Sequence, residues 1–361
     1  MRTFLLVPSM LLLLTVSYGC VGPLIEAARD GNITAAQNLI KGGMDVNGDE
    51  STDGESALIV ASKNGHRDVV RMLIQAGADV NRRTKYNDTA LSAAAWKCHP
   101  DVIDVLLASG ADPNVQNTSY NSTPLNLLAE FCNNAESAKA LILKGANTSL
   151  RNRCGNTALL TAAEHGYAEM VQILLDSGAD VNETGDLEQT ALHRAAGNGH
   201  VKTIAILLAR GADINRAANY RWCTGRFCLQ PQLKWTALMI AADHGHAEAV
   251  DLLLSKGADP HALTSDNQNA LVLAAKNGHA QIVESLFRRG VNPNIVPTDA
   301  IGHPAIISAA IRNHRTTVEV LLKNGADVNI KTVNGMTALT FAKINGRTEM
   351  QKYLEENGAK E

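Results

Sequence analysis

The sequence has few aromatic residues: phenylalanine, tyrosine and tryptophan make up 4% of its 361 residues. Because the core of an ordinary globular enzyme relies on aromatic bulk, we expect a core of small aliphatic side chains on closely packed helices. An excess of charge of one sign is also missing, with 33 basic and 36 acidic residues. This balance argues against a basic nucleic-acid-binding protein, and a hydrophobic content of 45% argues against wholesale disorder.

The sequence has no hydrophobic run as long as the roughly 20 residues that a membrane span requires. Its longest apolar stretch, Phe4 to Val16, has 13 residues and is interrupted by Pro8. Arg2 precedes this stretch, and the small residues Ser17 and Gly19 follow it. This arrangement is typical of a cleaved secretory signal, so we predict a signal peptide at residues 1–19 and an extracytoplasmic protein, either secreted or periplasmic.

Cys20 offers a second interpretation of the same segment. A cysteine directly after the apolar run is a lipidation site in bacteria, but Ser17 and Tyr18 depart from the usual residues at their positions. The repeated part of the chain also begins almost at once, at Gly22-Pro23-Leu24, which leaves no tether. A lipoprotein anchored to the cell envelope through Cys20 is therefore the alternative to a free exported chain.

A tripeptide recurs through the rest of the sequence. Its first residues lie 33 to 35 positions apart, except for one interval of 46. Clear copies are Ser56-Ala57-Leu58, Thr89-Ala90-Leu91, Thr123-Pro124-Leu125, Thr157-Ala158-Leu159, Thr190-Ala191-Leu192, Thr236-Ala237-Leu238 and Thr337-Ala338-Leu339. Three degenerate copies are Gly22-Pro23-Leu24, Asn269-Ala270-Leu271 and Pro304-Ala305-Ile306. These copies predict ten repeats.

Each repeat carries the signals of two short helices. The threonine is a helix N-cap, and the alanine pair after it, such as Ala195-Ala196, allows neighbouring helices to approach closely. An Asn-Gly-His turn and an apolar stretch then predict a second helix, which ends at Gly-Ala-Asp, as at Gly178-Ala179-Asp180. A single repeat cannot bury its apolar face, so the repeats must stack.

These features resemble the ankyrin repeat family, and the resemblance covers residues 21–361. Thr190-Ala191-Leu192-His193 is similar to the family's Thr-Pro-Leu-His signature. The resemblance implies an all-α repeat solenoid of helix pairs with β-hairpin fingers along one edge. The fourth repeat departs from the pattern because Phe131-Cys132-Asn133 replaces Asn-Gly-His. A long insertion at residues 216–234, within the sixth repeat, interrupts the period.

No active-site motif is present: the sequence lacks His-Glu-x-x-His, Gly-x-Ser-x-Gly and a phosphate-binding P-loop. His244-Gly245-His246 with Glu248 resembles a metal-ligand cluster, but no cysteine or further histidine lies nearby in the sequence. Six histidines occupy the same turn position of their repeats, which indicates a structural role: His66, His99, His200, His246, His279 and His314. We therefore predict a non-catalytic protein without metal or cofactor.

Four of the six cysteines fall into two groups, and Cys154 lies at a finger tip, at the other end of its repeat. Cys98 and Cys132 both replace the turn glycine of consecutive repeats, and stacked equivalent positions lie too far apart for a disulfide, so we expect both to be unpaired. Cys223 and Cys228 lie within the insertion with four residues between them, a spacing that a hairpin closes. In an oxidising compartment we predict a disulfide between them.

The resemblance also implies where a protein partner binds, because ankyrin ligands usually contact the finger tips and the concave face of the first helices. On this chain those positions include Tyr86, Trp96, Lys97, Tyr120, Glu130 and Phe131. Four of these six are aromatic, and aromatic residues are favoured interface anchors. Packing between repeats is the alternative role for these side chains.

The insertion is the second candidate surface. Residues 216–235 contain four basic residues and no acidic one, together with aromatic residues. Such a loop suits an acidic protein, a glycan or an anionic surface, although it could instead pack on neighbouring fingers. The residues that we expect to contact a partner are Arg221, Trp222, Arg226 and Phe227.

Together these patterns predict an exported, monomeric protein that binds another protein through its concave face and fingers. Membrane attachment is expected only if Cys20 is lipidated. A metal-binding or enzymatic site hidden in the insertion is the least favoured alternative.

Overall fold

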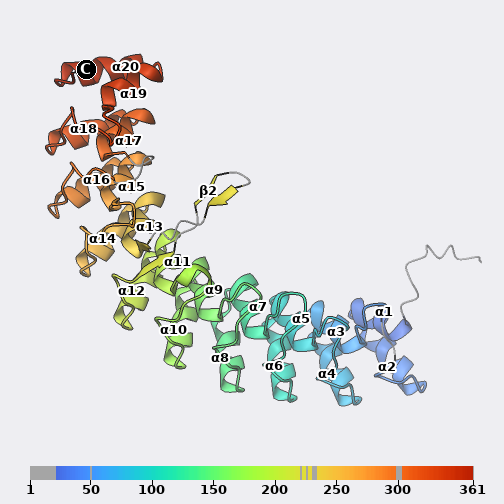
Figure 1. The fold of residues 1–361 in the computed structure, drawn as a ribbon. Coiled ribbons are helices and arrows are strands. Elements are labelled where there is room, and N and C mark those ends of the chain that lie inside the picture. The colour runs from blue at the N-terminus through green and yellow to red at the C-terminus, as the bar shows by residue number, and fades with distance from the viewer. Residues whose placement is uncertain are drawn as a thin grey trace, which may run out of the picture. The chain divides into compact units, whose positions relative to one another are not determined.

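The computed structural model describes residues 22–48, 51–219, 222–224, 227–229, 234–297 and 303–360. For residues 222–224 and 227–229 it describes the backbone only. The described residues contain 20 α-helices, and these follow one another in pairs (Figure 1). The chain divides into two compact units, Met1–Ser119 and Tyr120–Glu361.

The N-terminal unit contains three of these pairs. Its first helices α1, α3 and α5 pack side by side in one row, and its second helices α2, α4 and α6 form another (Figure 1). The helices are α1 (Pro23–Arg29), α2 (Ile33–Lys41), α3 (Ala57–Lys63), α4 (Arg67–Gln75), α5 (Ala90–Trp96) and α6 (Pro100–Ala108).

Within the C-terminal unit the helices also pack in two rows. Its first helices are α7 (Pro124–Phe131), α9 (Ala158–His165), α11 (Ala191–Gly197), α13 (Ala237–His244), α15 (Ala270–Lys276), α17 (Ala305–Ile311) and α19 (Ala338–Ile344). Its second helices are α8 (Ala135–Leu143), α10 (Ala168–Asp176), α12 (Val201–Ala209), α14 (Ala247–Ser255), α16 (Ala280–Phe287), α18 (Arg315–Lys323) and α20 (Thr348–Glu356). The predicted all-α solenoid of helix pairs is confirmed.

The tripeptide threonines begin the first helices, as predicted. The Thr89 side chain accepts a hydrogen bond from the Ser92 N–H, and Ser92 Oγ accepts one from the Thr89 N–H, which forms a capping box. Thr157 and Thr337 accept from the N–H three residues ahead in the same way. Each such cap typically contributes about 1 kcal/mol to stability.

The core lies where the two rows of helices meet. The alanine pairs are fully buried in the sixth and eighth repeats, at Ala195-Ala196 and Ala274-Ala275. Ile204 and Leu207 on α12 are also fully buried. Small side chains on the first helices let the rows of neighbouring repeats pack closely, which explains how the chain forms a core with few aromatic residues.

The turn histidines connect each repeat to the one before it. His66 Nε2 donates to the Arg29 carbonyl at 2.9 Å, and His279 Nε2 donates to the Asp243 carbonyl at 3.1 Å. His99, His200 and His246 make the equivalent bond to the last residues of the preceding first helix. The structural role predicted for the turn histidines is confirmed by these bonds.

Each of these histidine rings also lies against the turn glycine of the preceding repeat. A Cβ atom on that glycine would come within 2.5–2.7 Å of a ring atom, closer than real Cβ contacts allow. The six pairs are Gly31 with His66, Gly65 with His99, Gly166 with His200, Gly199 with His246, Gly245 with His279 and Gly278 with His314.

The exceptions show that the histidine ring, and not the backbone angle alone, requires glycine. Cys98 and Asn313 hold the same left-handed turn, with φ of 59° and 63°, although both have side chains. The repeats that follow them carry Asn134 and Arg347, and not histidine, at the ring position. In this chain every turn that precedes a histidine-bearing repeat is therefore a glycine.

The fingers are tight turns at the other end of each repeat, usually closed by one backbone hydrogen bond, such as Thr84 N–H to the Asp88 carbonyl at 2.9 Å. At this end of the repeat, an asparagine side chain links each of several repeats to the next one. Asn182 Nδ2 donates to the Gly211 carbonyl at 3.2 Å, and its Oδ1 accepts from the Asp213 N–H at 2.8 Å. Asn47, Asn81, Asn294 and Asn329 bridge to the following repeat in the same way.

Regular strands occur, within the described residues, only in and beside the insertion. Strands β1 (Ala217–Asn219) and β4 (Lys234–Thr236) pair antiparallel at its base, with Ala218 opposite Trp235, both buried. Strands β2 (Trp222–Thr224) and β3 (Phe227–Leu229) form a second antiparallel pair, and β2 extends away from the helices (Figure 1). The insertion is thus a hairpin on a buried base.

The prediction that Cys98 and Cys132 are unpaired is wrong, since both are disulfide-bonded. It assumed that they occupy equivalent turn positions. Cys98 does hold the left-handed turn, but Cys132 is extended, with φ of −145° and ψ of 110°, and is buried. The additional residue Asn133 changes this turn, so the spacing of equivalent positions does not apply to Cys132.

We predict that Leu207→Asp lowers the free energy of unfolding by about 4 kcal/mol or more, because it buries an unpaired charge on α12. Arg83→Ala, on an exposed finger, should change it by less than about 0.5 kcal/mol. Urea unfolding followed by far-ultraviolet circular dichroism measures both. Equal destabilisation by the two substitutions would contradict the repeat register.

The contact between turn glycine and histidine predicts an energetic coupling. Gly278→Asn should cost about 2 kcal/mol or more, because its Cβ meets the His314 ring. In the double variant with His314→Ala this clash disappears, so a double-mutant cycle should give a coupling of about 1 kcal/mol or more. Gly290→Asn is the matched control: its φ of 77° is similar and nothing lies near the added Cβ. A cost at Gly278 equal to that at Gly290, with no coupling, would refute the constraint.

Candidate protein-binding surface

The backbone of the finger tips is fixed by hydrogen bonds from the next finger. The Lys85 N–H donates to the Asp53 carbonyl at 3.0 Å, and the Thr118 N–H donates to the Tyr86 carbonyl at 2.8 Å. In the C-terminal unit the Arg153 N–H donates to the Tyr120 carbonyl at 2.7 Å. The tip residues therefore have a constrained main chain, while the side chains of Tyr86 and Tyr120 are exposed.

The four aromatic residues predicted as anchors are all exposed, so packing between repeats does not bury them. The exposed fraction is 49% for Tyr86, 41% for Trp96, 62% for Tyr120 and 51% for Phe131. These are the four exposed aromatic side chains among the described residues whose side chains the structure gives. Exposed aromatic side chains on a fixed backbone are suited to contact a partner.

In the N-terminal unit the structure brings Trp96 and Lys97 together at the end of α5. Lys97 Nζ lies 4.1 Å from the centroid of the Trp96 ring. This cation–π contact, which is typically worth 0.5–1 kcal/mol at exposed sites, restrains both side chains. The pair thus presents a flat apolar face beside a positive charge.

In the C-terminal unit Glu130 and Phe131 end α7. Glu130 Oε2 lies 3.9 Å from Nε2 of His165, at the end of α9, and this contact is an ion pair when His165 is protonated. The His165 ring stacks on Tyr167, with centroids 5.4 Å apart. Glu130 therefore has a neighbour in the next repeat, whereas the Phe131 side chain remains half exposed.

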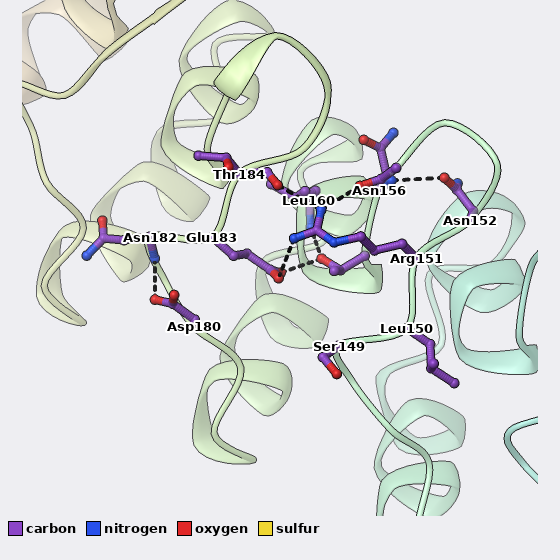
Figure 2. Close-up of polar contacts among 12 residues, drawn as sticks. Ser149, Leu150, Arg151, Asn152, Asn156, Leu160, Asp180, Asn182, Glu183 and Thr184 are labelled. Carbon is purple, nitrogen blue, oxygen red and sulfur yellow. Dashed lines mark hydrogen bonds and ion pairs between the residues drawn. The ribbon is translucent and has the colours of Figure 1, made fainter.

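A polar network joins two successive fingers of the C-terminal unit (Figure 2). Arg151 Nη1 donates to the Gly155 carbonyl of its own finger at 2.6 Å and to the Thr184 carbonyl of the next finger at 2.7 Å. Its Nη2 lies 3.9 Å from Glu183 Oε2, and Glu183 also accepts a hydrogen bond from Thr157 Oγ1. Arg151 thus holds the two fingers together.

Burial affects the acidic groups in and beside the fingers. Burial raises the pKa of Glu183, and the Thr157 hydroxyl and the Arg151 guanidinium oppose that rise. Burial also raises the pKa of Asp88, which accepts a hydrogen bond from Asn117 Nδ2 at 3.0 Å. Each of these carboxylates is engaged by hydrogen bonds at the finger edge of its own unit.

Two of the insertion residues predicted to contact a partner lie on the strands of its outer hairpin. Trp222 and Phe227 are on β2 and β3, where the backbone register pairs Trp222 with Leu229 and Thr224 with Phe227. Cys223 and Cys228 are directly opposite each other. Arg221 and Arg226, Cys20 and the predicted signal peptide at residues 1–19 lie outside the described residues.

Two further tip residues lie outside the contact set predicted from the sequence. Cys154 and Leu187 lie three residues before their tripeptides, the position that Tyr86 and Tyr120 occupy in earlier repeats. Cys154 is exposed with a free thiol, and Leu187 has φ of 60°, a strained value for a bulky residue. Aligning the repeats from their tripeptides would have identified this tip position.

The His244 and His246 cluster has a structural explanation. Both imidazoles bond the Gly197 carbonyl, through His244 Nδ1 at 2.6 Å and His246 Nε2 at 2.9 Å. Within the described part of the chain, no three histidine, cysteine or acidic side chains gather as a metal site requires. None of the helices in that part combines the length and apolarity needed to cross a membrane.

Comparisons with known proteins agree with this architecture. A family profile described as "Ankyrin repeats (3 copies)" matches residues 24–117, 125–218, 223–297 and 294–361. Human ankyrin repeat and SOCS box protein 3 is 42% identical over 149 residues, which are 41% of this chain and 29% of that protein. Ankyrin repeat and KH domain-containing protein mask-1 of Caenorhabditis elegans is 31% identical over 151 residues, 42% of this chain and 4% of that protein.

A shorter match links the chain to cortactin-binding protein 2 of Plecturocebus moloch, 47% identical over 57 residues, which are 16% of this chain and 3% of that protein. The chain thus spans less than a third of the length of each of these relatives. Ankyrin repeats typically act as non-catalytic scaffolds for protein–protein interaction. Because the family profile covers most of residues 24–361 and the helix pairs stack as it requires, the chain belongs to the ankyrin-repeat family.

Proposed function

We propose that this chain is an exported, non-catalytic protein that binds a protein partner through its finger tips, the ends of its first helices and the insertion. The observation that carries the proposal is the combination of fixed backbone and exposed aromatic side chain at the fingers. Tyr86 and Tyr120 are exposed, while their carbonyls are held by the next finger. Little backbone entropy would be lost when a partner covers such residues, which favours affinity.

The insertion supplies the charged part of this surface. Arg216, Arg221, Arg226 and Lys234 make it basic, and it contains no acidic residue between positions 216 and 235. We propose an acidic region of a protein as its target, because opposite charges steer association and fix its register. A Cys223–Cys228 disulfide would order the outer hairpin before the partner arrives, and the directly opposed register of the two residues supports this bridge.

Export is the second element of the proposal, and it rests on the sequence of residues 1–19. An exported chain would meet the oxidising conditions in which disulfides persist, in agreement with the disulfide-bonded state of Cys98 and Cys132. The alternative with the same binding role is a lipoprotein held to the envelope through Cys20. The two differ in the chemistry of the mature N-terminus.

We predict that shortening the insertion weakens partner capture without affecting the solenoid. Residues 220–233 would be replaced by a short Gly-Ser turn, which keeps β1, β4 and the buried pair Ala218 and Trp235. Helical content and melting temperature should stay nearly unchanged, because the hairpin lies outside the stacked helices. Retention of a partner, first purified on the intact chain from its native compartment, should fall, and more at low salt because the charges are then less screened.

Lys139→Ala, exposed on α8 away from the fingers, is the matched control and should retain the partner fully. If the shortened chain keeps every partner of the intact chain, the insertion has no part in binding. The exposed aromatic residues Tyr86, Trp96, Tyr120 and Phe131 would then carry the interaction.

We also predict that the mature chain begins at or near Cys20 outside the cytoplasm. Mass spectrometry of the N-terminal peptide should give an unmodified Cys20 for the free exported protein, and a diacylglycerol-modified one for the lipoprotein. A reporter fused after residue 30 should be cleaved and exported in either case. A reporter that stays uncleaved in the cytosol would exclude both forms.

A further inference from the structure

In one repeat of this chain, the residue directly after the tripeptide is a histidine. His193 occupies this position in the sixth repeat, the repeat that carries the insertion. The other nine repeats have different residues there: Ile25, Ile59, Ser92, Asn126, Leu160, Met239, Val272, Ile307 and Thr340. This coincidence suggests that the histidine serves the insertion as well as the helix.

The His193 side chain is almost completely buried between the start of α11 and the base of the insertion. Its Nδ1 lies 3.3 Å from the Thr190 N–H nitrogen and 2.8 Å from Thr190 Oγ1, which completes a capping box. Because Nδ1 accepts the backbone N–H, the ring proton lies on Nε2. That nitrogen donates to the Arg216 carbonyl at 3.0 Å.

The same ring reaches both ends of the insertion. Arg216 directly precedes β1, and the backbone of Trp235 in β4 lies near enough to the ring to raise the pKa of His193, against the larger effect of burial. These two strands are paired, with Ala218 opposite Trp235. One buried imidazole therefore bonds the helix cap and the residue before β1, and it lies beside β4.

We infer that His193 is a positioning residue: it fixes the base of the insertion against α11 and so determines how the outer hairpin is presented to a partner. This inference rests on the proposed binding role of the insertion only where it predicts partner capture. The fixing of the base can be measured without any partner.

The fourth repeat contains a smaller version of this connection. Asn126 Oδ1 accepts from the Thr123 N–H at 3.1 Å, and Asn126 Nδ2 lies 3.4 Å from the Leu150 carbonyl in its finger. An amide at this position thus reaches one finger carbonyl, whereas the longer imidazole reaches both sides of an enlarged finger. In the fifth repeat the equivalent residue is Leu160, whose apolar side chain cannot form this hydrogen bond.

The protonation state of His193 gives the inference a distinctive pH dependence. The pKa of His193 is lowered to about 4, and burial is the largest cause. The ring is therefore neutral at neutral pH. A free histidine titrates near 6.5, so the stability from the neutral ring is fully present above that pH. It is lost as the pH falls towards 4, when a proton on Nδ1 removes the acceptor for Thr190. The charged groups that act on the ring are Arg216 and Asp213.

The test compares His193→Leu and His193→Asn with the intact chain by hydrogen exchange of the amides at 217–219 and 234–236. We expect His193→Leu to lower protection at these amides by at least tenfold and His193→Asn to retain part of it. The amides of α17 to α20, three repeats away, should keep their protection in both variants. Asn126→Leu is the matched control, because it removes the equivalent bonds from a repeat without an insertion and should leave residues 217–219 and 234–236 unchanged.

The intact chain supplies a readout that does not depend on whether a variant folds. After correction for the intrinsic exchange rate, protection at 217–219 should fall at least tenfold as the pH is lowered from 7 to 4. The His193→Asn profile should be flatter, because asparagine does not titrate. A role confined to packing would give no such pH profile. Protection at the base that is the same in His193→Leu, and independent of pH in the intact chain, would overturn the inference.

Partner capture separates this inference from the proposed function. If His193→Leu loosens the base and also weakens retention of the purified partner, both are supported. If it loosens the base without changing retention, His193 still positions the insertion but the insertion does not bind. If shortening the insertion weakens retention while His193→Leu changes neither exchange nor retention, the positioning role is wrong and the proposed function stands.

Discussion

The contact between the turn histidine of one repeat and the turn glycine of the repeat before it fixes the stacking at six junctions of this solenoid. The imidazole lies where a Cβ atom would be, and its Nε2–H bonds a carbonyl at the end of the preceding first helix. A left-handed turn alone does not require glycine here, as Cys98 and Asn313 demonstrate. Glycine and histidine are therefore coupled between neighbouring repeats, so a change in one repeat affects its neighbour first.

The second connection, through the finger asparagines, lies at the opposite end of each repeat. Asn182 and its equivalents bond both a carbonyl and an N–H of the following repeat, so neighbouring fingers cannot slide past one another. Arg151 adds a clamp between two fingers. Where both connections are present, neighbouring repeats are fixed at both ends. The carbonyls of Tyr86 and Tyr120 are in addition held by the next finger, so their exposed side chains stand on a constrained backbone, which is the physical basis of the proposed binding role.

The sequence was sufficient for the helix pairs, their caps and the structural role of the turn histidines, because each repeat supplies the same local signals several times. The position of Cys132 could not be predicted from that template, since Asn133 adds a residue to its turn and changes the backbone. The bond from His193 to the Arg216 carbonyl at the base of the insertion was also hidden, because it joins residues 23 positions apart that only the folded base brings together. The exposure of Tyr86, Trp96, Tyr120 and Phe131 needed the structure, because the same positions could have packed between repeats.

Site-specific photo-crosslinking is the most direct test of the claim that the finger edge contacts the partner. A benzophenone-bearing residue would replace Tyr86, Tyr120 or, as a control, Leu143, which is 77% exposed at the end of the second helix α8. After irradiation in the native compartment, the account predicts the same crosslinked partner from positions 86 and 120 and none from position 143. Crosslinks from position 143 with none from the two finger tips would contradict the account.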